Sequence, residues 1–325
     1  MRYPKTTLVL TLLVVVAGVL AVGYALRRPA SPLAAVQSWD YQLQKLDLDR
    51  LARSKADMLV IDYSRTGHAS GALTQAEVQR LQERSDGRRR LVIAYLSIGE
   101  AEEYRYYWRP EWKTEPPPWL FAENCRWPGN HLVRYWLDGW KEIVFRSPDS
   151  YLSRIVAAGF DGVYLDRVDA FWDLRERYPD GRAHMIELVG ELAAHARRLR
   201  PGFLVIAQNA EALLDSPDYR ASIDAVAKED LLNGVSGTAI ANDAALIGWS
   251  LDRLRLLTAE GKPVLAVEYL RTSEAIRAAS ARLTALGFLA TFPTRALDGR
   301  DPLEPDPPAL HETTGTPEFS VKHCL

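Results

Sequence analysis

The sequence predicts a (β/α)8 TIM barrel, an α/β fold that forms a single catalytic domain, and three observations predict it. Eight apolar runs are typical of short buried strands, and they begin at Met58, Leu91, Leu132, Gly162, Phe203, Ile223, Val264 and Phe288. Most of these runs are separated by segments with the apolar spacing of an amphipathic helix, and this alternation favours a parallel barrel. Polar or acidic residues follow most runs, where barrel enzymes carry their chemistry. An open, doubly wound sheet is the alternative, although it would normally contain fewer strands.

Residues 1–28 are expected to form a membrane-inserting segment. An apolar run from Thr6 to Leu26 lies between pairs of basic residues, and as a helix it would span about 30 Å, enough to cross a bilayer. A cleaved signal peptide usually has a shorter apolar region. We therefore expect an uncleaved anchor, with a cleaved signal peptide and a buried core helix as alternatives. The catalytic domain is expected outside the cytoplasm (periplasmic or extracellular), although basic residues at both ends leave the orientation open.

Composition and charge set the other boundaries. Residues 29–38 are rich in proline and small residues and predict a linker, residues 39–300 hold the barrel, and residues 301–325 predict a flexible Pro-rich tail. The net charge of −2 gives no global field that would recruit nucleic acid. Cys125 and Cys324 lack the spacing of a zinc or redox motif, and the sequence leaves open whether they form a disulfide.

The segments between the strands predict helices in five places. Thr74 is the expected N-cap of the first, and the five expected helices cover residues 74–85, 147–158, 183–200, 242–260 and 273–286. Residues 39–54 are expected to lead into the first strand. Residues 104–128 contain seven Trp and Tyr residues among five prolines and predict a long irregular loop over the active face. That loop is either a platform for sugar rings or a satellite core.

Polar side chains follow the predicted strands at their C-terminal ends. They are Asp62, Glu100, Asp166, Asp169, Asn209, Glu229, Asp230 and Glu268. Strand ends of a barrel converge on one site, so several carboxylates share a pocket and raise one another's pKa. A protonated acid beside an ionised carboxylate is what glycoside hydrolysis requires. Divalent metal binding is the alternative use of such a cluster, but no strand-end His and no HExxH motif is present, so we expect no metal and no cofactor.

Some of these residues also have a purely structural interpretation. An ion pair with Arg or Lys of the barrel would account for Asp62 and Glu268. Asp169 is suited to cap the helix after its strand, and Asn209 is a common turn residue. Lys228 would neutralise one of the two acids that follow it.

Five segments of the sequence resemble the corresponding segments of glycoside hydrolase family 114. They are GFDGVYLDRVDAF, LVIDYS, LVIAYLSIGEAEEYRYYW, VIAQNAE and AVEYL, and the resemblance runs from about Trp39 to Asp298. The characterised members of that family are endo-α-1,4-polygalactosaminidases, which carry a catalytic Asp after the fourth strand and a catalytic Glu after the sixth. These positions fall on Asp166 and Glu229.

The resemblance implies a retaining mechanism with Asp166 as nucleophile and Glu229 as acid/base, although the adjacent Asp230 is an alternative for the second role. The residues expected to bind substrate are Asp62, Tyr95, Glu100, Asp169, Asn209 and Glu268. Because amino sugars are cationic at neutral pH, an acidic pocket suits a partly deacetylated, galactosamine-containing polysaccharide. Two other functions remain open: a non-catalytic carbohydrate-binding scaffold of an envelope or exopolysaccharide system, and a metal enzyme that uses carboxylates alone.

Overall fold

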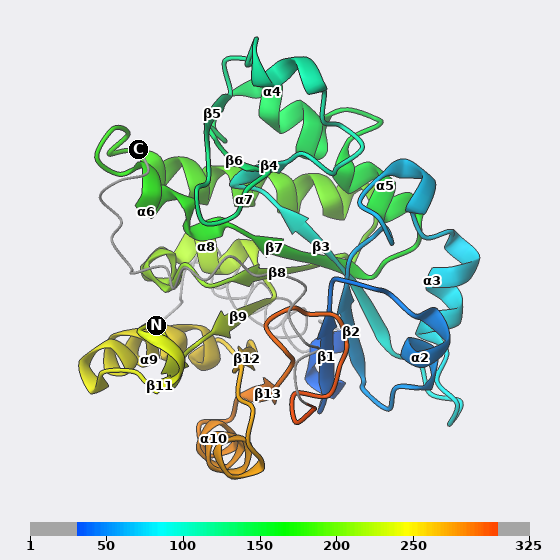
Figure 1. The fold of residues 1–325 in the computed structure, drawn as a ribbon, viewed down its shortest axis with the longest axis vertical. Helices are drawn as coiled ribbons and strands as arrows, with labels where there is room; N and C mark the ends of the chain where they lie inside the picture. Colours follow the sequence, from blue (N-terminus) through cyan, green and yellow to red (C-terminus); the bar gives the residue numbers. More distant parts are fainter. Residues whose placement is uncertain (1–30, 305–325) are drawn as a thin grey trace, which may run out of the picture. The chain divides into compact units, whose positions relative to one another are not determined.

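The computed structural model describes residues 31–304 (Figure 1). The expected anchor, Cys324 and most of the expected tail lie outside the described residues. No helix within residues 31–304 is both long and apolar enough to cross a membrane. The chain divides into two units, 1–35 and 36–325. In the first, the described residues form the short 3-10 helix η1 (Pro32–Ala35), and all that follows concerns the second.

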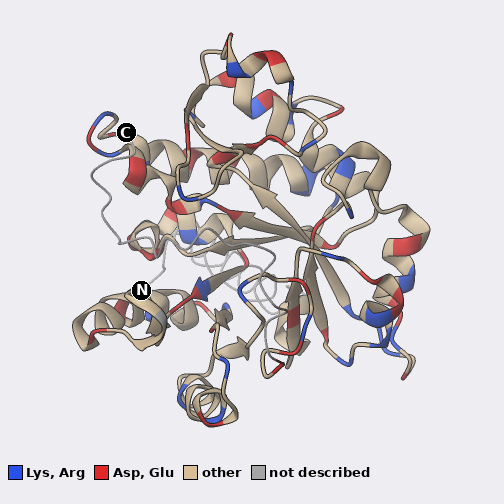
Figure 2. Ribbon diagram, in the orientation of Figure 1, with Lys and Arg blue, Asp and Glu red and all other residues tan. Residues whose placement is uncertain are grey.

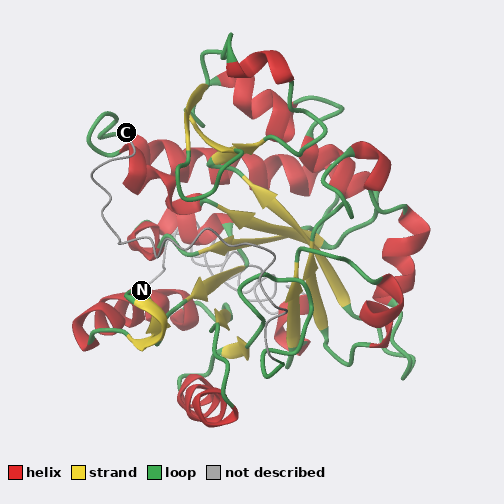
Figure 3. Ribbon diagram, viewed as in Figure 1, coloured by secondary structure: helices red, strands yellow, loops and turns green. Residues whose placement is uncertain are grey.

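Eight parallel strands form the central sheet, in the order β1-β2-β3-β7-β8-β9-β12-β13. Their bounds are β1 (Trp39–Gln42), β2 (Met58–Ile61), β3 (Leu91–Ser97), β7 (Gly162–Asp166), β8 (Leu204–Gln208), β9 (Ala225–Glu229), β12 (Val264–Val267) and β13 (Leu289–Thr291). Helices cover the outer face of the ring (Figure 3). Most residues of the strands are buried, because these helices pack on the outer face and the strands' own side chains fill the interior. The predicted (β/α)8 architecture is therefore confirmed in its eight parallel strands.

The two edge strands, β1 and β13, meet through side-chain and loop contacts. The indole Nε1 of Trp39 donates to the Leu289 carbonyl at 2.9 Å. Beyond the strands, the amides of Leu43 and Gln44 both donate to the Leu297 carbonyl, at 2.8 and 2.9 Å. The ring is thus nearly closed, with one seam that lacks a regular ladder.

Two strand assignments made from the sequence are wrong. The run at Leu132 is β6 (Asn130–Val133), which lies between β4 (Glu100–Glu102) and β5 (Leu120–Glu123) in a separate antiparallel sheet. The first barrel strand is Trp39–Gln42, which was expected only to lead in. Its aromatic side chains point into the barrel, where the Tyr41 ring lies 5.1 Å from that of Tyr164. Because the two errors offset each other, β7 is still the fourth barrel strand and β9 the sixth.

The expected helices are present with small shifts of their ends. The α-helices are α2 (Leu48–Arg53), α3 (Gln75–Gln82), α4 (Asp138–Lys141), α5 (Tyr151–Ala157), α6 (Phe171–Leu174), α7 (Gly181–Leu199), α8 (Pro217–Ser222), α9 (Ala244–Ala259) and α10 (Ser273–Ala285). Thr74 caps α3 in a capping box with Glu77, as predicted. The helix expected from residue 147 begins four residues later, because Ser150 is its N-cap.

Several shorter elements complete the described chain. They are the 3-10 helices η2 (Ala69–Gly71), η3 (Pro110–Lys113), η5 (Val168–Ala170) and η6 (Glu211–Asp215), the π-helix η4 (Glu142–Arg146), and the hairpin strands β10 (Asn233–Gly234) and β11 (Gly237–Ala241). The long loop predicted at 104–128 thus contains η3 and β5.

The aromatic residues of that segment pack against one another and against rings outside the segment, such as Tyr151 and Trp140. Trp112 meets Trp108 edge-on at 5.4 Å and Trp119 edge-on at 5.0 Å, and Trp119 contacts the fully buried Trp140 at 5.0 Å. Such edge-to-face pairs are typical of a satellite core. Trp127 differs, because 61% of its surface is exposed in the turn between β5 and β6.

Candidate active site

The C-terminal ends of β7, β8 and β9 bring the two predicted catalytic carboxyls to the same rim of the barrel. Asp166 is the last residue of β7 and Glu229 the last of β9. The strand between them, β8, ends at Gln208. Figure 2 shows acidic residues at the tips of β7 and β9. Parallel strands end on the same side of a barrel, so both carboxyls lie on its C-terminal face.

The backbone is left-handed immediately after each of these three strands. Arg167 has φ 57°, Asn209 has φ 55° and Asp230 has φ 50°. Non-glycine residues rarely adopt this conformation, which costs free energy and clusters at functional sites. Each of these residues follows a strand end and re-aims the chain, so the three outliers mark this rim as a candidate site.

Asp166 is held by two hydrogen bonds. The hydroxyl of Tyr95 donates to its Oδ2 at 2.6 Å, and the amide of Arg167 donates to its Oδ1 at 2.7 Å. Burial raises the pKa of Asp166 to about 7; the Tyr95 hydrogen bond opposes this rise, and the charge of Glu229 adds to it. Asp166 is therefore poised to change protonation near neutral pH.

Glu229 has a matching environment. It accepts hydrogen bonds from the hydroxyl of Tyr269 and, at 3.4 Å, from Asn209 Nδ2. Asn209 Oδ1 in turn accepts from the Glu229 amide at 3.1 Å, which fixes the turn. Burial raises the pKa of Glu229, while the Tyr269 hydrogen bond opposes the rise.

The neighbouring Asp230 has a different partner. Arg295 Nη2 contacts both of its carboxylate oxygens, at 3.0 and 3.1 Å. Burial raises the pKa of Asp230, but the charge of Arg295 opposes it. The charge of Glu229, by contrast, helps to raise the pKa of Asp166.

Buried tyrosines surround the two carboxyls. Tyr95 and Tyr269 bind them directly, and the charges of both carboxyls act on Tyr164. Burial raises the pKa of Tyr164 well above its ordinary value, so its phenol keeps its proton. Tyr269 and Tyr41 were not singled out from the sequence. Tyr269 directly follows the predicted site residue Glu268, and this position in the sequence could have identified it as a site residue. Tyr41 lies in the first barrel strand, which the sequence analysis did not recognise as a strand.

Asp62 was expected either to bind substrate or to form an ion pair with a basic residue of the barrel, and the structure shows the ion pair. Arg105 Nη1 lies 2.8 Å from Asp62 Oδ2, and Arg105 Nε lies 2.6 Å from Glu102 Oε2. The Arg105 side chain is fully buried and both acids are nearly so. Burial raises the pKa of Asp62 and Arg105 opposes this. Asp62 thus helps to anchor the segment after β4.

Arg167 links three acids beside Asp166. Its guanidinium pairs with Glu100 at 2.8 Å, with Asp169 at 3.2 Å and with Asp173. Asp169 is paired in this way and makes no helix-cap hydrogen bond. A Cβ on Gly99 would overlap the Arg167 carbonyl, so only glycine lets the turn between β3 and β4 approach so closely.

Two predicted site residues are too deeply buried to present a surface to a ligand. Glu100 is 1% exposed and also accepts from Asn124 and Asn130, at 2.7 and 3.3 Å. Glu268 is 0% exposed and accepts from the amides of Leu232 and Asn233, at 2.7 and 3.2 Å. Within residues 31–304 Glu268 has no Arg or Lys partner, so the ion pair expected for it is absent from this range. Glu268 holds the segment after β9, and Glu100 holds the turn between β5 and β6.

Comparison with known proteins places the chain in a family. Residues 24–304 match glycoside-hydrolase family GH114. An uncharacterized protein of Deinococcus radiodurans is 37% identical over 276 residues, which cover 84% of each chain. One of Methanocaldococcus jannaschii is 40% identical over 206 residues, which cover 62% of this chain and 55% of that protein's length.

The fold comparison agrees. The glycoside hydrolase domain of PelA from Pseudomonas aeruginosa matches with a TM-score of 0.63 and 22% identity, over 81% of this chain and 97% of that chain. At this identity the likeness shows the fold. The barrel, the two carboxyls on its C-terminal face and the match over residues 24–304 lead to one conclusion: the chain belongs to glycoside-hydrolase family GH114.

Proposed function

We propose that this glycoside hydrolase cleaves an amino-sugar polysaccharide with retention of configuration, with Asp166 as nucleophile and Glu229 as acid/base. One observation carries the proposal. Asp166 and Glu229 are the last residues of β7 and β9, the two strands that flank β8. Each carboxyl accepts a hydrogen bond from a tyrosine hydroxyl. Within the described range neither carboxyl forms an ion pair with an Arg or Lys side chain, whereas Asp62 pairs with Arg105 and Asp230 with Arg295.

The proposed reaction has two steps. The Asp166 carboxylate attacks the anomeric carbon while Glu229 donates its proton to the departing glycosidic oxygen, so the C–O bond breaks and a glycosyl ester of Asp166 forms. Glu229, now ionised, takes a proton from water, whose oxygen attacks the same carbon and releases Asp166. Burial and mutual repulsion oppose ionisation of both carboxyls together. The pair therefore keeps one proton at neutral pH, as the first step requires.

The charge beside Asp166 supports a cationic substrate. One Arg167 guanidinium is shared by Glu100, Asp169 and Asp173, so this cluster keeps a net negative charge. The side chains of Asp169 and Asp173 are 33% and 35% exposed. They would attract protonated amino groups of a partly deacetylated, galactosamine-type polymer. Endo action is proposed on the resemblance to characterised members of the family.

A substrate screen tests this proposal. The purified protein is incubated with polygalactosamine, with its fully N-acetylated form and with a neutral galactan, and products are identified by mass spectrometry. We expect internal cleavage of polygalactosamine and much slower cleavage of the acetylated polymer. The difference between the two rates should shrink in high salt, because salt screens the charge of the substrate. Equal cleavage of all three polymers would contradict a role for substrate charge.

The pH dependence should separate the roles of the two tyrosines. Hydrolysis needs Asp166 ionised and Glu229 protonated, so kcat/KM should fall on both sides of an optimum. Tyr95→Phe removes a donor that lowers the pKa of Asp166, so the acidic limb should move to higher pH. Tyr269→Phe removes a donor that lowers the pKa of Glu229, so the alkaline limb should move to higher pH. If both variants move the same limb, the assignment of roles is wrong.

The scaffold alternative predicts no turnover on any polymer. It would gain support if either carboxyl were locked in an ion pair, and the tyrosine contacts of Asp166 and Glu229 favour catalysis instead. A carboxylate metal enzyme predicts that EDTA abolishes hydrolysis, whereas the proposed reaction proceeds in EDTA.

We also propose that the domain acts outside the cytoplasm, held or exported by residues 1–28. The support is the apolar run between Thr6 and Leu26. Protease added to intact cells or spheroplasts should digest the domain, while a cytoplasmic marker survives. Protection of the domain until the cells are lysed would contradict this location.

A further inference from the structure

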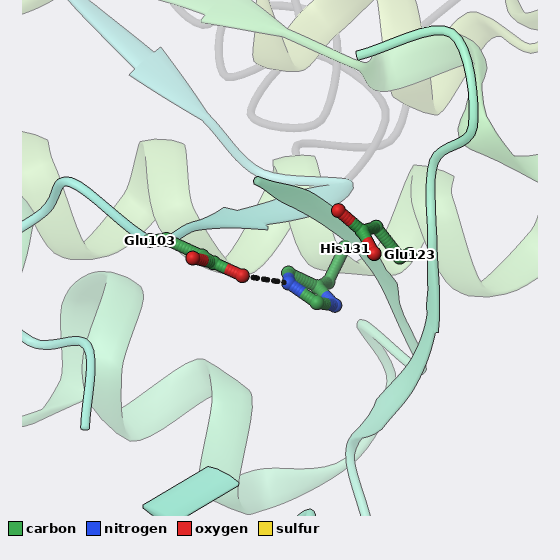
Figure 4. Close-up of side chains that lie close together, drawn as sticks. All are labelled: Glu103, Glu123 and His131. Carbon is green, nitrogen blue, oxygen red and sulfur yellow. Dashed lines mark hydrogen bonds and ion pairs between the residues drawn. The ribbon is translucent and has the colours of Figure 1, made fainter. Parts of the chain in front are cut away.

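We propose that Glu103, Glu123 and His131 bind a divalent transition-metal ion away from the catalytic carboxyls (Figure 4). Glu103 directly follows β4, Glu123 ends β5 and His131 lies in β6. One ligand atom from each residue lies within 4.8 Å of the other two. No other group of three His, Cys, Asp or Glu side chains within residues 31–304 converges in this way.

The antiparallel sheet explains why these side chains converge. Glu123 and His131 are direct cross-strand partners, and His131 also pairs with Ala101 of β4. Partners across antiparallel strands point to the same face of a sheet. The amide of Glu103 donates to the Gly129 carbonyl at 2.9 Å, which fixes the third residue beside the other two. Three strands thus hold the three backbones in place.

The geometry is close to that of a ligand set. His131 Nε2 lies 2.9 Å from Glu103 Oε1, and Figure 4 shows the Glu103 carboxylate directed at the imidazole. In a tetrahedral zinc site with bonds near 2.0–2.2 Å, neighbouring ligand atoms lie about 3.3–3.6 Å apart. The imidazole is fixed by stacking on Trp108 at 4.7 Å. Glu123 is exposed and Glu103 partly so, so rotation of a carboxylate closes the remaining gap.

The existing partners leave room for an ion. Lys113 pairs with Glu103 Oε2 at 2.6 Å, but its side chain is 56% exposed, and exposed ion pairs contribute little. Oε1 of Glu103 faces the histidine. The amide of Gly129 donates to Glu123 Oε1 at 2.9 Å; this orients the carboxylate, as outer hydrogen bonds do in metal sites, and leaves Oε2 for an ion.

The ligand types indicate which ions fit. One imidazole and two carboxylates suit Zn²⁺ or Mn²⁺, whereas Ca²⁺ prefers six to eight oxygen ligands. With three protein ligands, water fills the remaining positions. The metal would fasten β4 to the β5–β6 turn. Asn124 in that turn and Asn130 at the start of β6 both donate to Glu100, which pairs with Arg167 next to Asp166. The ion would thus brace one side of the catalytic rim without touching the reacting atoms.

The test is metal binding by the untagged full-length protein after EDTA treatment and dialysis. Zn²⁺, Mn²⁺ and Ca²⁺ are titrated separately by calorimetry, and melting is followed with and without each ion. We expect one Zn²⁺ per chain with a dissociation constant below about 0.1 mM, a higher melting temperature with Zn²⁺, and no effect of Ca²⁺. Glu123→Gln and His131→Asn should each weaken Zn²⁺ binding by about tenfold or more.

His184→Asn is the matched control, because His184 lies on α7 outside the cluster and should be replaced without effect on Zn²⁺ binding. Glu123→Gln guards against misfolding, since Glu123 is exposed and its replacement keeps the size of the side chain. Absence of both Zn²⁺ and Mn²⁺ binding up to about 1 mM, or unchanged affinity in Glu123→Gln, would overturn the proposal. Both readouts are independent of hydrolysis, so they stand whether or not the proposed catalytic roles are correct.

Discussion

Asp166→Asn is expected to lower turnover by about 10⁴-fold or more, because loss of the proposed nucleophile would abolish the covalent route and leave only binding and electrostatic effects. The fold should survive. The Arg167 amide can still donate to the side-chain carbonyl of asparagine, and the asparagine NH2 group can donate to the Tyr95 hydroxyl oxygen. The measurement is initial rate on the polymer, together with circular dichroism and a thermal melt.

The same variant should be more stable than the natural protein at high pH. Burial raises the pKa of Asp166 to about 7, so in the folded state its ionised form is disfavoured relative to the unfolded chain. The resulting penalty is absent below the unfolded pKa and grows as pH rises toward 7. Asn cannot ionise, so the melting temperature of Asp166→Asn should exceed that of the natural protein at pH 8 and match it near pH 4.

Asp138→Asn is the control for the loss of a carboxylate. Asp138 begins α4, and its side chain is 84% exposed in an ion pair with Arg146. Its replacement should change neither turnover nor melting appreciably. Hydrolysis by Asp166→Asn at a rate within tenfold of the natural protein would rule out Asp166 as nucleophile.

Glu229→Gln is expected to lower turnover on the polymer by about 10²–10⁴-fold, the usual contribution of a general acid and base. The size of this decrease in turnover should depend on how readily the leaving group departs without a proton. With a dinitrophenyl glycoside, which needs no protonation, the first step should proceed and the glycosyl ester on Asp166 should accumulate. Mass spectrometry of the quenched protein would detect it. Added azide should restore turnover, since it attacks without a general base.

Asp230→Asn separates the two adjacent acids. Asp230 is paired with Arg295, and we expect its replacement to preserve the leaving-group dependence of the natural protein. If Asp230→Asn accumulates the ester and Glu229→Gln does not, the acid/base role belongs to Asp230. If neither variant accumulates it, the retaining mechanism itself is wrong.

The barrel could be predicted because most of its strands leave a pattern of apolar residues in a short stretch of sequence. Runs such as Leu91–Ser97 are buried along their whole length, and a strand covered on both faces shows this as continuous apolar sequence. The first strand, Trp39–Gln42, escaped detection because Asp40 faces solvent and the strand has four residues. The run at Leu132 also contains buried apolar residues, but its partners are β4 and β5. A short apolar run does not encode which strands it will pair with.

The sequence by itself predicted a parallel barrel with Asp166 after one strand and the pair Glu229 and Asp230 after another. Only the tertiary structure decided how their environments differ from those of their neighbours. The tyrosine that binds Glu229 lies 40 residues further along the chain, and the arginine that binds Asp230 lies 65 residues further. The left-handed backbone at Arg167, Asn209 and Asp230 sets the direction of each turn. Residue spacing records local burial, whereas partners brought from distant parts of the chain exist only once the barrel has closed.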